Sequence, residues 1–266
     1  MTIDRAAQAR LSYLDTPGAA FRPPGGPALR WAGNLKWLAL TSGQVVSTCN
    51  RWPTVFFDFL SPARREARSL MLRSGLKLTI PTTYHFQSIA ETVLMNLYRL
   101  PEIVDGSVLD IGASIGDFTL YAASRTRGKV LAFEPDVQSF AFLTRNIEIN
   151  HATNVVAVNS PFSKTRGDAV PAPSFRGPIR FAKIDCEGCE YELFSRDSYV
   201  NWSQVQEVHM EIHPPPPGYS VSGLLAQLAY WGFRLETSTF GGCPYLHAYH
   251  ESSYLNGSAI PHLSSA

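Results

Sequence analysis

The chain of 266 residues has no excess of either charge, few cysteines and no long apolar run. Its 23 basic and 22 acidic residues give a formal net charge of +1, so the composition offers no electrostatic argument for a nucleic-acid partner. The most apolar early stretch, 35–49, is interrupted by polar residues and is too short to span a bilayer. The N-terminus, MTIDRAAQAR, lacks the apolar region of a secretory signal. We therefore expect a cytoplasmic protein with no membrane span and no nucleic-acid partner.

The four cysteines are unevenly scattered and do not form the pattern of a disulfide framework. Cys186 and Cys189 make a single C-x-x-C, and no second pair stands at zinc-ligand spacing. We interpret these two residues as packing residues rather than a redox or metal site. The sequence thus predicts reduced thiols and no bound metal.

Strand and helix patterns alternate through most of the chain. Residues 1–62 are expected to form a mostly helical extension, 63–252 one main domain and 253–266 a loose tail. Within the main domain the alternation predicts an α/β fold, a mostly parallel sheet with helices on both faces, and one antiparallel strand among the last two. The expected strands are 107–111, 129–133, 154–159, 179–184, 204–212, 233–239 and 245–250, and the expected helices are 86–100, 115–124, 137–150, 189–194 and 221–231; a hairpin is expected at 70–81.

The first of these strand–helix units, VLDIGASIGDF at 108–118, carries a glycine turn of a particular kind. Gly112 and Gly116 are spaced GxxxG, and the middle glycine of GxGxxG, which lets backbone approach a pyrophosphate, is missing. The turn therefore favours a ligand with adenosine but no diphosphate. S-adenosylmethionine (SAM) fits that description better than NAD.

Polar residues at the carboxyl ends of the first three strands are the cofactor candidates, because ligands bind at that edge of open α/β sheets. Glu134 ends the second strand, where its carboxylate can accept hydrogen bonds from both ribose hydroxyls. Asp110 lies in an apolar strand, where it either orients the turn by accepting backbone N–H groups or holds the ammonium end of the cofactor. Asn159 and Ser160 follow the third strand as positional candidates for adenine. The predicted cofactor-binding residues are Asp110, Gly112, Ala113, Gly116, Glu134, Asn159 and Ser160.

Two acidic segments, KIDCEGCEYELF and VHMEIHPPPP, end the fourth and fifth strands. Glu211 and His213 lie two apart and so point the same way on a strand. We predict His213 as a general base, oriented by Glu211 or Asp185; a satisfied structural histidine is the alternative. Binding of a divalent metal by Asp185, Glu211 and His213 is an alternative interpretation that rests on their spacing alone. Glu187 is expected at the substrate, whereas Glu190 equally fits simple complementarity to the helix dipole.

Taken together, VLDIGASIGDFTLYAA, VLAFEPD, NIEIN, KIDCEGCEYELF and VHMEIH resemble the successive motifs of FkbM-type SAM-dependent methyltransferases. The resemblance covers about residues 50–250 and implies a Rossmann-like, seven-stranded, mostly parallel sheet of the class I methyltransferase type. It implies SAM as cofactor and O-methylation of a small-molecule natural product or glycan; some relatives methylate nitrogen on peptides. It also places Glu91 and Tyr98 either along the acceptor pocket or, as ordinary packing residues, against the sheet.

The chain departs from that family at two places. Ser114 stands where an asparagine is usual, and the short segment 160–178 lacks the usual helix. Two other classes stay open: a Rossmann oxidoreductase, and a non-catalytic partner subunit with the same fold. The acceptor, a small molecule or a peptide, would be chosen by residues in 1–100 and 160–178, and the extension at 1–62 could form a homodimer.

Overall fold

The structure is a computed structural model that describes residues 11–15, 42–53, 55, 67–163, 178–198, 200–240 and 243–251. Residues 42–48 are helical and lie within the extension expected at 1–62. Most other residues of that extension, the segment 164–177 and the tail at 253–266 lie outside the described residues. The division of the chain into an extension, a domain and a tail stays a prediction.

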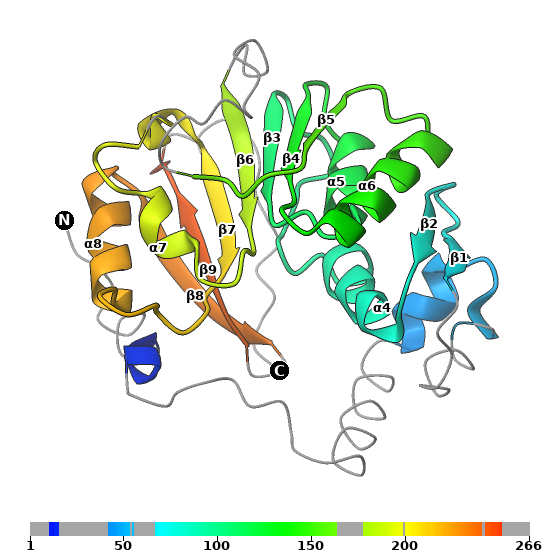
Figure 1. The fold of residues 1–266 in the computed structure, drawn as a ribbon, viewed down its shortest axis with the longest axis horizontal. Coiled ribbons are helices and arrows are strands. Elements are labelled where there is room, and N and C mark those ends of the chain that lie inside the picture. The colour runs from blue at the N-terminus through cyan, green and yellow to red at the C-terminus, as the bar shows by residue number, and fades with distance from the viewer. Residues whose placement is uncertain are drawn as a thin grey trace.

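One seven-stranded sheet organises the described part of the chain, in the order β5-β4-β3-β6-β7-β9-β8 (Figure 1). The first five of these strands run parallel, and β9 is antiparallel to both of its neighbours. The predicted mostly parallel sheet, with one antiparallel strand at the end of the chain, is therefore confirmed. The strands are β3 (Ser107–Ile111), β4 (Val130–Phe133), β5 (Val155–Val158), β6 (Ile179–Ile184), β7 (Glu207–Glu211), β8 (Arg234–Phe240) and β9 (Cys243–Tyr249).

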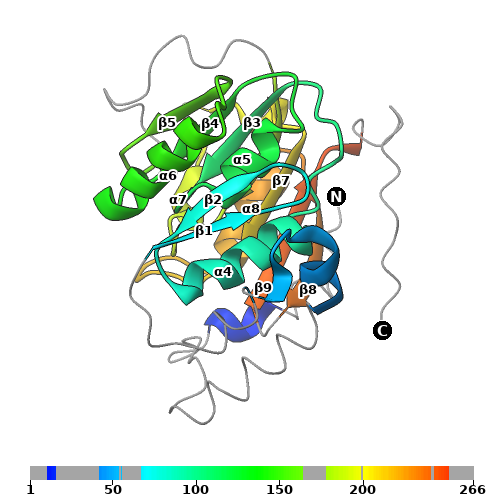
Figure 2. The same cartoon turned by 90° about the vertical axis from the view of Figure 1, so that its right-hand side faces the viewer.

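Helices cover both faces of the sheet, which explains why every residue of β3 and β4 is buried (Figure 2). One face carries α4 (Thr83–Ile89), the π-helical turn η2 (Ala90–Leu94), α5 (Asp117–Ala123) and α6 (Val137–Ile149). The other face carries α7 (Glu190–Leu193) and α8 (Val221–Tyr230). Alternate residues of the central strands divide between these two cores, as the side-chain alternation of a strand requires.

Two N-terminal pieces pack on the domain. The predicted hairpin is present as β1 (Arg68–Met71) and β2 (Lys77–Ile80), and the buried Asn146 of α6 bonds both the N–H and the C=O of Thr79. The short helix η1 (Ser12–Asp15) reaches α8, where the Asp15 carboxylate accepts the N–H of Val221 at 2.7 Å. Part of the predicted extension thus belongs to the core of the domain.

Three predicted boundaries shift for local reasons. The helix expected at 86–100 runs from Thr83 to Leu94, and the left-handed Asn96 and Arg99 follow its end. The helix expected from 115 starts at Asp117, because Gly116 is left-handed with φ +88°. The strand expected at 204–212 is shorter, since a 3₁₀ turn, η3 (Trp202–Gln204), precedes β7.

Among the described residues, no helix is both long and apolar enough to cross a bilayer.

The first glycine of the turn after β3 is required by a close backbone approach. Gly112 has φ +77°, and a Cβ placed there would lie 1.7 Å from the carbonyl oxygen of Asp185. Gly218 has a similar φ, +89°, but nothing lies within 4 Å of its Cβ position. Substitution at Gly218 therefore introduces backbone strain alone, whereas substitution at Gly112 introduces backbone strain and a steric overlap.

We expect Gly112→Ala to lower the free energy of unfolding by more than about 3 kcal/mol, because strand ends must move apart. Gly218→Ala should lower it by only about 1–2 kcal/mol, the cost of a left-handed alanine. Urea unfolding of both variants measures the difference. Equal losses at the two positions would contradict the close-approach argument.

Candidate active site

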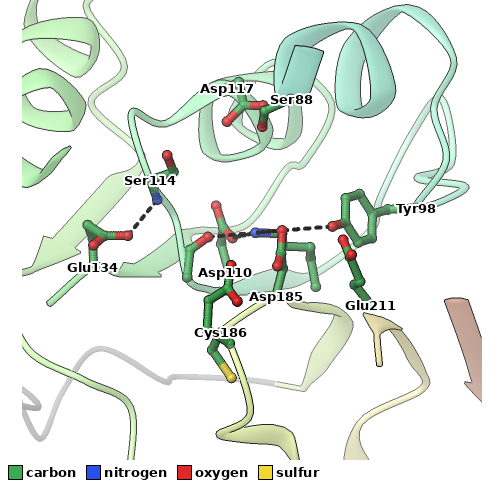
Figure 3. Close-up of polar contacts among 12 residues, drawn as sticks. Ser88, Tyr98, Asp110, Ser114, Asp117, Glu134, Asp185, Cys186 and Glu211 are labelled. Atoms are coloured by element: carbon green, nitrogen blue, oxygen red, sulfur yellow. Dashed lines mark hydrogen bonds and ion pairs between the residues drawn. The ribbon is translucent and has the colours of Figure 1, made fainter. Parts of the chain in front are cut away.

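The glycine turn is held by Glu134, the acid that follows β4. Its Oε2 accepts the N–H of Ser114 at 2.7 Å (Figure 3). Its Oε1 accepts the N–H of Asp136 at 2.8 Å. Ser114 needs this support because it is left-handed, with φ +49°. The residue that departs from the family pattern therefore lies at the candidate ribose carboxylate.

Asn159 and Ser160 lie beside this acid, at the end of β5. The Asn159 amide donates to the carbonyls of Glu134 and Pro135, at 2.8 and 3.3 Å, and so braces the loop. The Ser160 hydroxyl donates to the carbonyl of Pro161. Their contact with adenine stays a prediction, as does that of Ala113, which is buried against α6.

Asp110 is fully buried, and its partners differ from the first alternative drawn from the sequence, in which it accepts backbone N–H groups; its contact with the ammonium end of the cofactor stays a prediction. Its Oδ2 accepts the hydroxyl of Thr119 at 2.5 Å, and its Oδ1 lies 3.4 Å from the ammonium of Lys183. Lys183 in turn donates to the carbonyl oxygen of Gly112 at 2.6 Å. Asp110 thus orients the turn through a lysine rather than through backbone N–H groups.

Lys183 also reaches the acid at the end of β6. Its ammonium lies 3.6 Å from Oδ2 of Asp185, and the same oxygen accepts the hydroxyl of Tyr98 at 3.0 Å (Figure 3). Burial opposes the charge of Lys183, but the carboxylates of Asp110 and Asp185 outweigh it and raise the pKa of the lysine. Lys183 therefore stays charged and links the cofactor candidates to the catalytic candidates.

Glu211 and Tyr98 face Asp185 from different elements, as Figure 3 shows. The Tyr245 hydroxyl of β9 donates to Oε2 of Glu211 at 3.4 Å. Burial, and then the charge of Asp185, raise the pKa of Glu211. Burial, followed by Glu211 and Glu91, raises the pKa of Tyr245, so Glu91 also acts on this group. Tyr98 is thus brought to Asp185, and the charge of Glu91 reaches Tyr245, which contacts Glu211.

His213 is held by Glu190 rather than by Glu211 or Asp185. Oε1 of Glu190 accepts the backbone N–H of His213 at 2.9 Å and lies 3.2 Å from its Nδ1. The other ring nitrogen, Nε2, faces Asp185 at 3.8 Å and Glu187 at 3.6 Å. Burial lowers the pKa of His213, but the hydrogen bond and charge of Glu190, aided by Asp185 and Glu211, raise it to about 9.

Cys186 and Cys189 form a disulfide, which corrects the interpretation of this pair as reduced packing residues. The turn between them brings their Cα atoms to 5.5 Å, within the range that a disulfide requires. Glu187 lies in that turn with φ +55° and its side chain is exposed. The bridge therefore fixes the loop that presents Glu187 to the edge of the site.

Lys183, Thr119, Tyr245 and the role of Glu190 did not emerge from the sequence. Lys183 could have been found, because it lies in the apolar strand IRFAKI, where a buried lysine needs a negatively charged partner, just as the buried Asp110 needs a positively charged one. Nothing in the sequence marks Tyr245, whose place depends on the pairing of β7 with β9.

Donor atoms of Asp185, Glu211 and His213 lie within 4.8 Å of one another, so a cation is sterically possible there; the absence of a metal stays a prediction.

Comparisons with known proteins add solved structures that resemble part of the chain. No protein-family model and no curated protein matches it. It is similar to precorrin-6y C5,15-methyltransferase from Geobacter metallireducens, with 17% identity over 59% of this chain and 85% of that one, at a TM-score of 0.42. A SAM-dependent methyltransferase from Aquifex aeolicus aligns with 16% identity over 58% and 87%, at 0.41. An rRNA methylase from Streptococcus thermophilus aligns with 14% identity over 58% and 91%, at 0.41.

The order of the strands, rather than these alignments, defines the fold. An otherwise parallel sheet ordered β5-β4-β3-β6-β7, followed by β9 and β8 with β9 antiparallel, is the Rossmann-like fold of class I SAM-dependent methyltransferases. The fold class predicted from the sequence is therefore confirmed.

Removing the charge of Lys183 should leave the buried carboxylate of Asp110 and the partly exposed carboxylate of Asp185 without their cation. We expect Lys183→Met to lower the free energy of unfolding by about 3–5 kcal/mol. Lys129→Met, at an exposed lysine before β4, should change it by less than about 0.5 kcal/mol. Adding Asp110→Asn to Lys183→Met should recover part of the loss, which urea unfolding of the double variant measures. A double variant as unstable as the sum of the two single variants would refute the pairing.

The raised pKa of His213 should be visible in a titration. We expect its NMR signals to titrate near pH 9 and to move toward 6.5 in Glu190→Gln, because the buried partner loses its charge. Glu192→Gln is the matched control on α7, since that carboxylate accepts from Tyr219 instead.

The raised pKa of His213 also makes the free energy of unfolding depend on pH. Because the folded-state pKa lies above the unfolded one, the stabilisation is complete below about pH 6.5 and is lost as the pH rises through about 9. His213→Gln should remove that slope from unfolding free energies measured between these pH values. A slope that persists in this variant would assign the effect to another group.

Proposed function

We propose that the chain is a SAM-dependent methyltransferase that methylates a hydroxyl group of a small-molecule natural product or a glycan. One observation carries the proposal: a glycine turn without a pyrophosphate approach and an edge bearing carboxylates and a histidine meet at Lys183. Both groups lie at the carboxyl ends of strands in a class I methyltransferase sheet, where this fold class places its ligands.

The residues of the turn fit an adenosine cofactor. The strand ends leave no room for a side chain at Gly112, so backbone forms the wall of the turn. Each oxygen of the Glu134 carboxylate accepts one N–H and keeps a lone pair for a hydroxyl donor. In the proposal Glu134 holds the ribose, Gly112 and Gly116 shape the turn, and Asp110 acts through Lys183.

The acceptor hydroxyl would be placed among Asp185, Glu211 and His213. SAM supplies an electrophilic methyl group on a sulfonium centre. His213 takes the hydroxyl proton on Nε2 while Glu190, at Nδ1, fixes the ring and balances its charge. With a pKa of about 9, only about 1% of His213 is neutral at pH 7, so proton transfer is favoured at alkaline pH.

The proposal extends to the family of the chain and to its location in the cell. The motif DCEGCE, residues 185–190, supports an FkbM-type relationship, because Asp185 and Glu190 both have contacts within the site. A cytoplasmic location is supported by the composition of the chain. The disulfide in this motif would then be open to thiol exchange, as cytoplasmic disulfides generally are.

N-methylation of an amine on a peptide or metabolite is a second candidate. The observation that favours it is the surplus of carboxylates around the acceptor position: Asp185, Glu187 and Glu211 face one histidine. Such a site would attract an ammonium group. Mass spectrometry and NMR of the product distinguish an O-methyl from an N-methyl group.

Binding tests the cofactor. Calorimetry should show binding of S-adenosylhomocysteine and none of NAD. Glu134→Ala should weaken the binding at least about tenfold, the cost of about one charged hydrogen bond, whereas Glu148→Ala on the exposed face of α6 should not. Binding of NAD alone would favour the oxidoreductase class.

Turnover tests the chemistry. A labelled-methyl assay against candidate hydroxyl and amine metabolites should give a methylated product, with a rate that rises toward pH 9. His213→Gln should abolish that rise and lower turnover about 10²-fold or more, with S-adenosylhomocysteine affinity retained. Cofactor binding without transfer to any acceptor would favour the non-catalytic partner subunit.

A further inference from the structure

A second cluster of ionisable side chains lies on the sheet, apart from the candidate active site. Glu207 and His209 alternate along β7 and share one face with His247 of β9. Strand pairing sets His209 directly opposite His247, and His247 opposite Glu236 of β8. Three neighbouring strands thus place two imidazoles and two carboxylates in one patch.

The inner members of this cluster are buried. The side chains of His209 and His247 are 5% and 4% exposed, and that of Glu207 is 11% exposed. Oε2 of Glu207 lies 3.7 Å from Nε2 of His209 and 3.5 Å from Nε2 of His247. Within the part of the chain that the structure describes, these three atoms have no hydrogen-bond partner, and neither has Nδ1 of His247.

So many unpaired polar atoms in one place require an explanation, because a buried polar group without a partner is costly. The surroundings offer little compensation: Phe181 stacks on His209 at 5.0 Å between ring centroids, and Tyr249 lies beside His247. The unpaired nitrogens and the carboxylate oxygen converge on one another. That convergence is what a bound cation would satisfy.

We propose that Glu207, His209 and His247 form a binding site for a divalent transition-metal ion, with Zn²⁺ as the ion that suits this donor set. Two imidazoles and one carboxylate are a common zinc ligand set, and donors bonded to tetrahedral zinc lie about 3.3 Å apart. The oxygen-to-nitrogen separations of 3.5 and 3.7 Å are close to that value, and the three ligand atoms all lie within 4.8 Å of one another.

The carboxylate of Glu236 lies behind His247, where it could orient this ligand without binding the metal itself. Oε2 of Glu236 lies 3.8 Å from Nδ1 of His247, so a small movement would let it accept that N–H and orient the ring. Glu236 is 43% exposed and bonded to Arg99, so the site opens to solvent on this side.

Binding requires one adjustment. The rings of His209 and His247 stack at 3.8 Å with an interplanar angle of 23°. A metal must lie in the plane of each imidazole it binds, so the two rings must rotate apart about their Cβ–Cγ bonds. The ion would then join β7 to the antiparallel β9. This inference does not depend on the proposed methyl transfer, because none of its residues has a role in that chemistry.

The test is the metal content of the full chain, freed of affinity histidines, loaded with Zn²⁺ and dialysed. Elemental analysis should find one equivalent of zinc in the native protein and in His151→Asn, an exposed histidine that serves as the control. His209→Gln and Glu207→Gln should retain less than a tenth of an equivalent. His213→Gln, at the active-site edge, should retain the full equivalent.

Two measurements on the native chain keep the proposal testable if a variant does not fold. Co²⁺ in place of Zn²⁺ should give the intense visible bands of a four-coordinate ion, and a chelator should lower the unfolding temperature. Absence of zinc from the native protein would overturn the proposal, and would instead indicate an imidazolium held between Glu207 and Glu236. Loss of zinc in His213→Gln but not in His209→Gln would place the ion at the active-site edge and equally overturn it.

Discussion

A buried ammonium group joins the two halves of the candidate site. Lys183 contacts a carboxylate of β3, a carboxylate after β6 and the carbonyl oxygen of Gly112, all within 3.6 Å. Because the group is buried, its charge depends on the nearby carboxylates of Asp110 and Asp185, which outweigh burial and raise the pKa of Lys183. The geometry of the glycine turn and the position of Asp185 are therefore set by one interaction.

Carboxylates dominate the edge of the sheet where the acceptor would bind. Two basic side chains, Lys183 and His213, lie next to them and differ in kind. Lys183 is buried and its carboxylate neighbours raise its pKa, whereas His213 lies nearer the edge and can lose its proton. Glu190, fully buried behind His213, makes the histidine more basic than usual. A site of this kind suits a ligand that carries positive charge or loses a proton.

The sequence was sufficient for the features that depend on local pattern. Buried strands, the glycine turn and the acids at strand ends are readable because each strand ends at the same edge of the sheet. Glu190 as the partner of His213 was not readable, since 23 residues separate them and α7 must first pack beside β7. The disulfide was missed for a similar reason: C-x-x-C spacing fits packing equally well until the turn conformation is known.

The antiparallel strand β9 contributes to both cores at once. Tyr245 and His247 face Glu211 and Glu207, while Leu246 and Ala248 lie in the core on the opposite face. A register slip of one residue would exchange these sets, placing an imidazole in an apolar layer and a leucine among carboxylates. One residue inserted or deleted in β9 would therefore disturb the packing on both faces of the sheet unless a β-bulge absorbed it, so the length of this strand is constrained as well as its composition.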